Sequence, residues 1–290
     1  MPRTIDEGFR DLLTKLTPSS TESEVAKNHR ASIKSCLETN YGMSNFFKTG
    51  SFGNGTSVSG YSDVDYFAVI PTENHKQDSS TNLTNIKNTL VRRFPNTGVR
   101  VSCPAIVLPF GKAAKESTEV VPADYRRKTN GYNEYEIADC IGGWMDSSPS
   151  AHKAYIKKHD DRLYGKLRPL IRFIKAWKFY KNVKISSFYL ELRIAKLMES
   201  ESSIVYSIDI KNILSWLYDN NLSAIRDPKG ISGLIQPCKT NAQKTDALSK
   251  LNTAKTRAVN ARQHEENKNI KNAFYNWNLI FDNKFPSFYK

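Results

Sequence analysis

Asp63 and Asp65 are the residues whose type and spacing most clearly indicate chemistry in this chain. They flank Val64 at the start of an apolar run that ends at Ile70. Alternate side chains of a β-strand share a face, so both carboxylates would project together while Val64 points into the core. Two such carboxylates can bind Mg²⁺, because hard cations prefer oxygen ligands and offset the repulsion between the acids. The simpler alternative is a pair of acids at a solvated strand end.

A Gly-Ser pair, Gly50 and Ser51, precedes these acids and opens a loop rich in Gly, Ser, Thr and Asn. Glycine tolerates the backbone of a tight turn and lets a ligand approach closely. The backbone N–H groups of the turn and the serine hydroxyl could bind a phosphate. A phosphate site followed by a metal site predicts nucleotidyl transfer.

The order Gly-Ser, short loop, acid-apolar-acid resembles the signature of the polymerase-β-like nucleotidyltransferase superfamily. The segment Ser186 to Glu191 and the closing Trp277 and Phe285-Pro286 resemble one branch of it, the bacterial cGAS/DncV-like nucleotidyltransferases (CD-NTases). Members of that branch make cyclic di- or trinucleotide signals in anti-phage defence. The resemblance covers nearly the whole chain and implies the same activity here.

A third carboxylate, on a neighbouring strand, is implied by the resemblance. Glu119 matches it best, because Thr118 to Ala123 follows the family's order of acid, two apolar residues, Pro and Ala. Most relatives have Asp at this position, and the extra methylene of Glu119 moves the carboxylate outward by roughly 1.5 Å. Asp124 and Glu116 are alternatives, and an exposed strand acid without a catalytic role is a further one.

The nucleotide-binding residues are expected on a basic helix and the segment that follows it. Arg168, Arg172 and Lys175 recur at helical spacing and share one face, which could also be simply solvated. The resemblance implies that Lys175 and Ser187 contact the triphosphate and that the ring of Phe188 stacks on the base. Core packing is the alternative for Phe188.

The fold class that the pattern predicts is α+β, a mixed α/β chain. The resemblance specifies a polymerase-β-like core with a small twisted sheet over residues 1–150, a helical domain over 151–290, and an active site in the cleft between them. The first helix, with capping-box spacing at Thr21 and Glu24, is expected to span both lobes. Strands are expected from near Asn45 and over 64–70, 99–103, 105–110 and 118–121, with a hairpin turn over 112–117. Helices are expected over 83–94, 163–177, 188–198, 208–218, 244–268 and 270–280.

A long loop is expected from Pro122 to about Ser150, because turn residues recur along it. Its aromatic residues, Tyr132, Tyr135 and Trp144, could line a second nucleotide pocket.

Composition limits the partners and the compartment. The 290 residues include 43 Lys and Arg against 29 Asp and Glu, a formal charge of +14 that favours polyanionic partners. No apolar stretch approaches the roughly 20 residues that span a bilayer, and no secretory signal is apparent, so no membrane partner is expected. The four cysteines stand far apart without a Cys-x-x-Cys pair, which predicts reduced thiols in a cytoplasmic protein and no zinc site.

The resemblance further implies the cofactor and the partners. Two Mg²⁺ ions per site, replaceable by Mn²⁺, would bind to Asp63, Asp65 and Glu119. The substrates would be ATP, GTP or UTP, and the product would act on a downstream effector. An activating RNA or other polyanion could bind the basic surface. Two alternatives remain open: an enzyme that adds NMP to an RNA end or small acceptor, and a catalytically dead relative that binds nucleic acid.

Overall fold

The computed structural model describes residues 3–18, 20–61, 63–110 and 116–289, with backbone alone for 20–26 and 116. The chain divides into two compact units. The sheet unit comprises Pro18–Ala154 and Lys229–Ser232, and the helical unit comprises Met1–Thr17, Tyr155–Pro228 and Gly233–Lys290. The division falls within α5 (Pro149–Arg162). The α+β class expected from the sequence is confirmed.

A seven-stranded mixed sheet forms the centre of the sheet unit. Its main path runs β1-β2-β5-β4-β3, with β6 and β7 continuing from β5. The pairing of β2 with β5 is parallel, and the other pairings are antiparallel. The strands are β1 (Asn45–Thr49), β2 (Val64–Val69), β3 (Arg100–Ser102), β4 (Ala105–Phe110), β5 (Glu116–Thr129), β6 (Tyr132–Ala138) and β7 (Trp144–Ser147).

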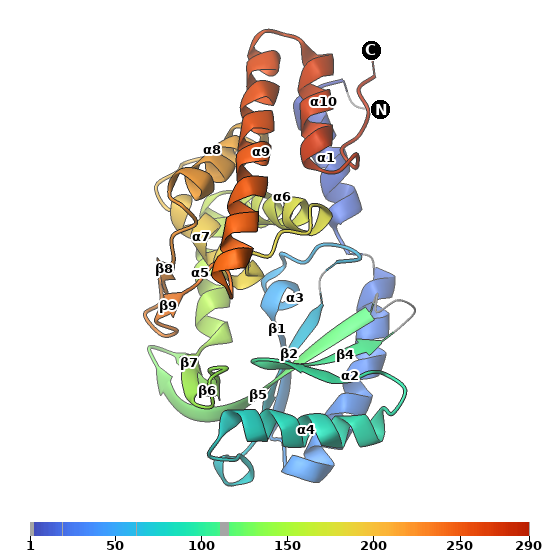
Figure 1. Ribbon diagram of the computed structural model, residues 1–290, viewed down its shortest axis with the longest axis vertical. Coiled ribbons are helices and arrows are strands. Elements are labelled where there is room, and N and C mark those ends of the chain that lie inside the picture. Colours follow the sequence, from blue (N-terminus) through green and yellow to red (C-terminus); the bar gives the residue numbers. More distant parts are fainter. Residues whose placement is uncertain (1–2, 19, 62, 111–115, 290) are drawn as a thin grey trace. The chain divides into compact units, whose positions relative to one another are not determined.

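Two helices, α2 (Ser20–Tyr41) and α4 (Ser79–Arg93), pack on one face of this sheet (Figure 1). Ile33 of α2 and Ile86 of α4 are fully buried and belong to one apolar cluster with Tyr66 of β2 and Val120 of β5. Asp78 caps α4, since its Oδ1 accepts a hydrogen bond from the Thr81 amide at 2.6 Å. The short elements α3 (Gly50–Asn54) and η1 (Thr72–Asn74) follow β1 and β2.

The opposite face of the sheet has a second apolar cluster. Phe67, Val121 and Ala123, which alternate with the residues of the first cluster, pack there with Tyr135 and Ile137 of β6. The acids of β2 and β5 fall on this face, because they share the alternation of Phe67 and Val121.

The prediction of a loop from Pro122 to about Ser150 is wrong. β5 continues to Thr129 and returns as β6, and β7 follows. Asn130 (φ 51°) and Gly131 (φ 83°) form the two-residue hairpin between β5 and β6, since both adopt the positive φ that a type I′ turn requires. Tyr135 is 4% exposed and part of the core rather than of a loop. The hairpin turn expected over 112–117 lies largely outside the described residues.

The prediction of four reduced thiols is also wrong. Cys103 and Cys140 form a disulfide with a Cα–Cα distance of 5.6 Å, although they are 37 residues apart in sequence. Cys103 lies in the turn between β3 and β4, and Cys140 lies between β6 and β7. Cys36 and Cys238 are free thiols.

The helical unit surrounds an aromatic core. Phe9 of α1 makes edge contacts with Phe173, Trp277 and Phe285, at centroid distances of 5.2, 5.1 and 5.1 Å. Its helices are α1 (Ile5–Leu16), the end of α5, α6 (Leu167–Tyr180), α7 (Ser187–Leu197), α8 (Tyr206–Asp219), α9 (Asn241–Glu266) and α10 (Ile270–Ile280), with a small hairpin of β8 (Ile225–Arg226) and β9 (Leu234–Ile235).

The N-terminal region forms two helices, α1 in the helical unit and α2 in the sheet unit. A capping box of Thr4 and Glu7 starts α1. The side chains of the capping box expected at Thr21 and Glu24 lie outside the described part of the chain. Among the helices described, none is both long and apolar enough to cross a membrane.

Candidate active site

Asp63 directly precedes β2 and Asp65 is its second residue, on the face away from α2 and α4. Val64 and Tyr66, the intervening residues, are 7% and 0% exposed, whereas both acids are only partly buried. Exposure thus alternates only at the start of β2, since Tyr66 to Val69 are buried on both faces of the sheet.

Glu119 lies beside this pair. The parallel register of β2 and β5 places Asp65 opposite Glu119, with Val64 opposite Thr118 and Tyr66 opposite Val120. Neighbouring strands lie about 4.8 Å apart, and paired residues of parallel strands point to the same face. The backbone thus brings Asp65 and Glu119 together on one surface.

The two alternatives for the third acid differ in their surroundings. Asp124 is 6% exposed, accepts a hydrogen bond from the Thr72 hydroxyl at 2.8 Å, and pairs with Arg126 at 3.5 Å. It lies beyond the last β2–β5 pair, Val69 with Ala123. Asp124 is thus engaged in a local structural network. The side chain of Glu116 lies outside the described residues.

The donor chemistry of the acids fits a hard cation. Within the described residues, no three His, Cys, Asp or Glu side chains are gathered closely enough to hold an ion by themselves. Mg²⁺ does not require such a cage, because it keeps several waters and is commonly held by one or two carboxylates together with substrate phosphates. Asp65 with Asp63 and Glu119 meets that requirement.

The Gly-Ser turn packs directly against Asp65. Thr49, the last residue of β1, is opposite Asp65 in the sheet, and Gly50 follows it with a φ of 55°. A Cβ at position 50 would lie 1.8 Å from Oδ2 of Asp65, far inside van der Waals contact. Only glycine therefore allows the turn and this carboxylate to be so close. Ser51, the next residue, is 9% exposed.

A group of cations that sequence analysis did not anticipate includes Lys48, which lies close to this turn in the sequence. Burial lowers the pKa of Lys48, and the positive charges of Lys27 and Arg30 lower it further. Lys48 lies two residues before Gly50. Lys27 and Arg30 are spaced i, i+3 on α2 and so share one face of that helix. This spacing is the signal from which sequence analysis could have predicted a basic group. Arg30 donates from Nη2 to the carbonyl oxygen of Phe46 at 2.9 Å, which places it beside β1, the strand that also bears Lys48.

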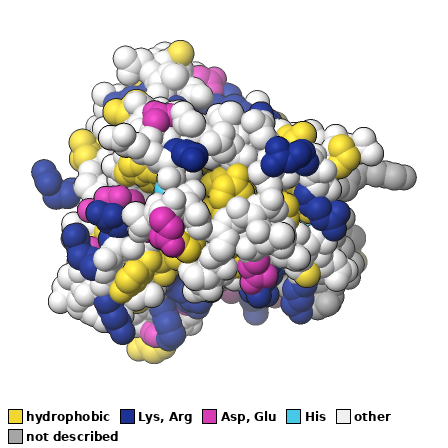
Figure 2. Space-filling view, turned by 90° about the horizontal axis from the view of Figure 1, so that it is seen from below, with side chains coloured by type: hydrophobic (Ala, Val, Ile, Leu, Met, Phe, Trp, Pro, Cys, Tyr) yellow, Lys and Arg dark blue, Asp and Glu magenta, His cyan; other side chains and the backbone are white. Residues whose placement is uncertain are grey.

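The face of the molecule in Figure 2 has Lys and Arg side chains scattered among acidic and uncharged ones. The excess of positive charge is thus distributed on this face rather than gathered in one stripe.

Lys175 and Ser187, expected to act together, have different partners in the helical unit. Nζ of Lys175 donates to Oε1 of Glu191 at 2.7 Å, and the lysine is fully buried. Nζ of Lys178, one turn further along α6, donates to Oγ of Ser187 at 2.7 Å. Ser186 serves as the N-cap of α7 by accepting from the Tyr189 amide, so capping does not involve Ser187. Sequence analysis does not single out Lys178 for this contact.

Phe188 is 37% exposed and thus differs from the core aromatic residues of this unit, such as Phe173 at 0%. Core packing therefore does not account for it.

Comparison with solved structures defines the class of fold. Escherichia coli MS115-1 CdnC, in its structure with ATP, matches with a TM-score of 0.73 over 97% of this chain and 98% of that chain, at 17% identity. Escherichia coli DncV in its 3′-deoxy GTP-bound form matches at 0.72 over 94% of both chains, at 16% identity. Bradyrhizobium diazoefficiens CdnG in complex with GTP matches at 0.70 over 96% of both, at 12% identity. The fold is that of the polymerase-β-like nucleotidyltransferases.

The family follows from the sequence itself. Residues 3–160 match the model of the SMODS domain, the Second Messenger Oligonucleotide or Dinucleotide Synthetase domain. This match covers more than half of the chain, and the chain belongs to the SMODS family. A probable cyclic nucleotide synthase of Bacillus cereus (strain VD146) is 26% identical over 178 residues, 58% of this chain. The match spans about half of that curated relative, 51% of its length. The resemblance to CD-NTases is confirmed.

Proposed function

We propose that this protein synthesises a cyclic di- or trinucleotide from nucleoside triphosphates without a template, with release of pyrophosphate. The observation that carries the proposal is the in-register pairing of Asp65 with Glu119, beside a glycine turn that contacts Asp65. Membership of a synthetase family supports the same reaction class. The reaction is attack by a ribose hydroxyl on the α-phosphate of a bound triphosphate.

Each unit has a set of residues with a role in this reaction. Gly50 and Ser51 bind phosphate through the backbone amides of the turn and the serine hydroxyl. Glu119 accepts the proton of the attacking hydroxyl or contributes to the metal site. Mg²⁺ or Mn²⁺, two ions per site held by Asp63, Asp65 and Glu119, would neutralise charge at the reacting phosphate.

The helical unit holds the nucleotide. Lys175 and Ser187 contact the triphosphate, and the partly exposed ring of Phe188 stacks on a base. The 2.7 Å contact between Lys178 and Ser187 adds Lys178 to this set. A lysine is a compact point charge with three donors, so Lys178 can keep its contact with Ser187 and also bind a phosphate oxygen.

The substrates in this proposal are ATP, GTP or UTP, since the CdnC and CdnG structures contain ATP and GTP. The product acts in bacterial anti-phage signalling on a separate effector, in the cytoplasm, and a polyanion such as RNA activates the enzyme. The excess of positive charge, +14, favours such a polyanion. It equally favours the second candidate function, addition of NMP to an RNA end.

Incubation with each NTP and with all four, in Mg²⁺ and without acceptor, tests the proposal. Phosphatase-resistant products with the masses of cyclic di- or trinucleotides are expected. The Asp63→Ala/Asp65→Ala double variant should fold and give no product. Transfer of NMP to an added RNA in the absence of cyclic product would establish the second candidate instead. Nucleotide turnover that survives the double change would contradict the catalytic assignment.

A further inference from the structure

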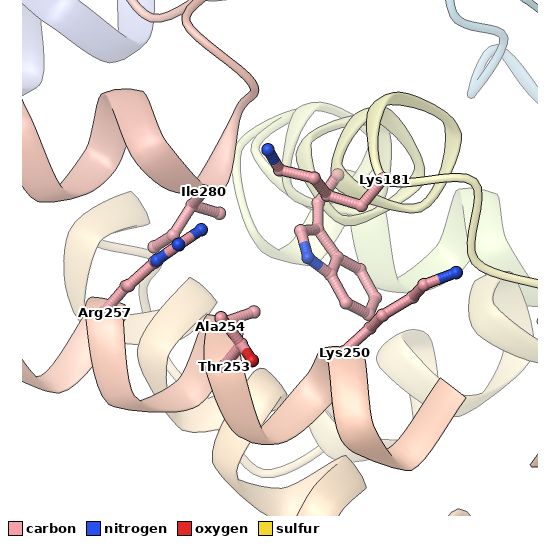
Figure 3. A pocket seen from close by; sticks show the side chains of 7 residues that line it. Lys181, Lys250, Thr253, Ala254, Arg257 and Ile280 are labelled. Atoms are coloured by element: carbon pink, nitrogen blue, oxygen red, sulfur yellow. The ribbon is translucent and has the colours of Figure 1, made fainter. Parts of the chain in front are cut away.

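A basic pocket lies inside the helical unit, between α6, α9 and α10, apart from Ser187 and the residues paired with it. Its volume is about 140 Å³. Lys181 follows the end of α6, Lys250 and Arg257 stand on α9, and Ile280 ends α10 (Figure 3). All of the lining residues belong to one unit, so the pocket is defined by the packing of that unit alone.

Positive charge exceeds negative charge around this pocket. Lys181 pairs with Asp282 at 2.6 Å, and Lys250 pairs with Asp246 at 2.8 Å. Arg257 donates to the carbonyl oxygen of Leu279 at 3.0 Å, and across the described residues no carboxylate lies within ion-pair distance of it. Two of the three cations are thus neutralised by carboxylates, and the charge of Arg257 is not.

The remaining walls of the pocket are apolar. The side chains of Trp177, Ala254 and Ile280 line it and are 2%, 2% and 1% exposed. Small-molecule sites typically combine such walls with a few polar groups that fix the orientation of the ligand. A guanidinium is the group best suited to a carboxylate or phosphate, because its parallel N–H groups match two oxygens.

Size restricts the ligand further. A protein cavity of roughly 150 Å³ holds one benzene molecule, so this pocket has room for a ring-sized group and its anionic substituent at the opening. A nucleotide or a cyclic dinucleotide exceeds it.

We propose that this pocket binds a small organic oxyanion, whose carboxylate or phosphate pairs with Arg257 and whose apolar body lies against Trp177. The ligand contacts α6, the helix that also bears Lys178. Its binding would therefore affect the contact that Lys178 makes with Ser187 of α7. The inference depends on the pocket alone and not on the proposed nucleotide chemistry.

Calorimetric titration of the full-length protein tests this inference, with benzoate, phenyl phosphate, inorganic phosphate and the neutral benzyl alcohol as probes. Benzoate or phenyl phosphate should bind at least about tenfold more tightly than benzyl alcohol, since a charged hydrogen bond is worth about 1.5–3 kcal/mol. Inorganic phosphate, which lacks the ring, should bind more weakly than phenyl phosphate. The preferred headgroup distinguishes carboxylate from phosphate ligands.

Three variants locate the binding. Arg257→Gln should weaken the affinity for the preferred probe about tenfold or more, and Ala254→Phe should abolish binding by filling the pocket. Lys271→Gln removes the same charge from an exposed position of α10 and should leave the affinity unchanged. Circular dichroism verifies the fold of each. The proposal is overturned if no ringed anion binds, if benzyl alcohol binds equally well, or if Lys271→Gln lowers the affinity as much as Arg257→Gln does.

Discussion

Glu119 lies directly opposite Asp65, on the only parallel strand pair recorded in the described part of the sheet. Parallel pairing keeps the two side chains on one face, so a strand that is distant in sequence supplies the acid next to Asp65. Glu119→Gln preserves the shape of the side chain and removes its charge. We expect turnover of NTPs to fall about 10²–10⁴-fold, the usual contribution of a positioned acid or base. Product formation by mass spectrometry measures it.

Asp124→Asn is the matched control for this change. Asn keeps an oxygen that can accept the hydrogen bond from Thr72, and the residue lies beyond the β2–β5 pairing. Turnover should remain close to that of the parent, with some loss of stability because the ion pair with Arg126 is removed. If Asp124→Asn is inactive and Glu119→Gln is active, Asp124 rather than Glu119 is the third acid of the site.

Gly50→Ala tests the contact between the turn and Asp65. The added Cβ meets Oδ2 of Asp65 at 1.8 Å, so the carboxylate or the turn must move. A displacement of about 1 Å in a catalytic group can reduce a rate by roughly 10²-fold, and we expect a loss of that size. Thermal unfolding should also show destabilisation, because alanine at positive φ is unfavourable.

Gly165→Ala separates these two effects. Gly165 has a φ of 74°, and a Cβ there would have nothing within 4 Å. This variant should lose a similar amount of stability from backbone strain but keep its turnover. If Gly50→Ala retains full activity, the close approach of the turn to Asp65 has no part in catalysis.

The pattern of the sequence was sufficient for β2. Asp63 to Tyr66 alternate, and the apolar run that follows is typical of a strand buried on both faces, as Tyr66 to Val69 are. The same reasoning missed β6. Turn residues recur from Pro122 to Ser150 and predict a loop, whereas Asn130 and Gly131 form the tight turn of a hairpin between β5 and β6. Sequence distance likewise says nothing of spatial distance, which is why the Cys103–Cys140 disulfide was not expected.

The candidate site shows the same limit. Spacing along a helix places Lys175 and Lys178 near one another but does not show which one contacts Ser187. The contacts depend on how α6 packs against α7. This packing places Lys175 beside Glu191 and Lys178 beside Ser187. The partner strand of Asp65 was inferred from family resemblance, because no local rule specifies which strands pair.

The buried Lys175–Glu191 pair should have a structural role that can be separated from phosphate binding. Removal of one partner leaves a buried charge uncompensated, so Glu191→Gln or Lys175→Met should cost about 3–5 kcal/mol in urea unfolding. The double variant Lys175→Met/Glu191→Leu should recover most of that stability, since apolar replacement of a buried pair is often neutral. Single variants as stable as the parent would contradict this.

NTP affinity in these variants distinguishes the two lysines. Lys178→Gln should raise the KM for NTP with little change in stability, because this lysine is only partly buried. The stable double variant keeps Lys178, and its KM then reports the direct contribution of Lys175. A normal KM in the double variant would assign the phosphate contact to Lys178 alone.

His75 should make the stability of the sheet unit depend on pH. Its ring lies between the carbonyl oxygen of Ile70, 3.2 Å from Nε2, and the side-chain amide of Asn82, 3.1 Å from Nδ1. Burial lowers the pKa of His75, although Asp124 and these hydrogen bonds act in the opposite direction. A folded-state pKa below the unfolded value of about 6.5 means that the neutral ring stabilises the fold above that pH. This contribution is lost as the pH falls through the folded-state pKa.

His75→Gln removes the titrating group while keeping an amide at the same place. The parent should be more stable than this variant at pH 8, and the difference should shrink as the pH falls below about 6.5. The loss is about 1.4 kcal/mol for each pH unit by which the folded-state pKa lies below the unfolded one. Urea unfolding of both proteins from pH 8 to pH 5 measures this difference and cancels the acid titration that they share. A difference that stays constant over this range, or grows toward acid, would show that the buried imidazole is not the group responsible.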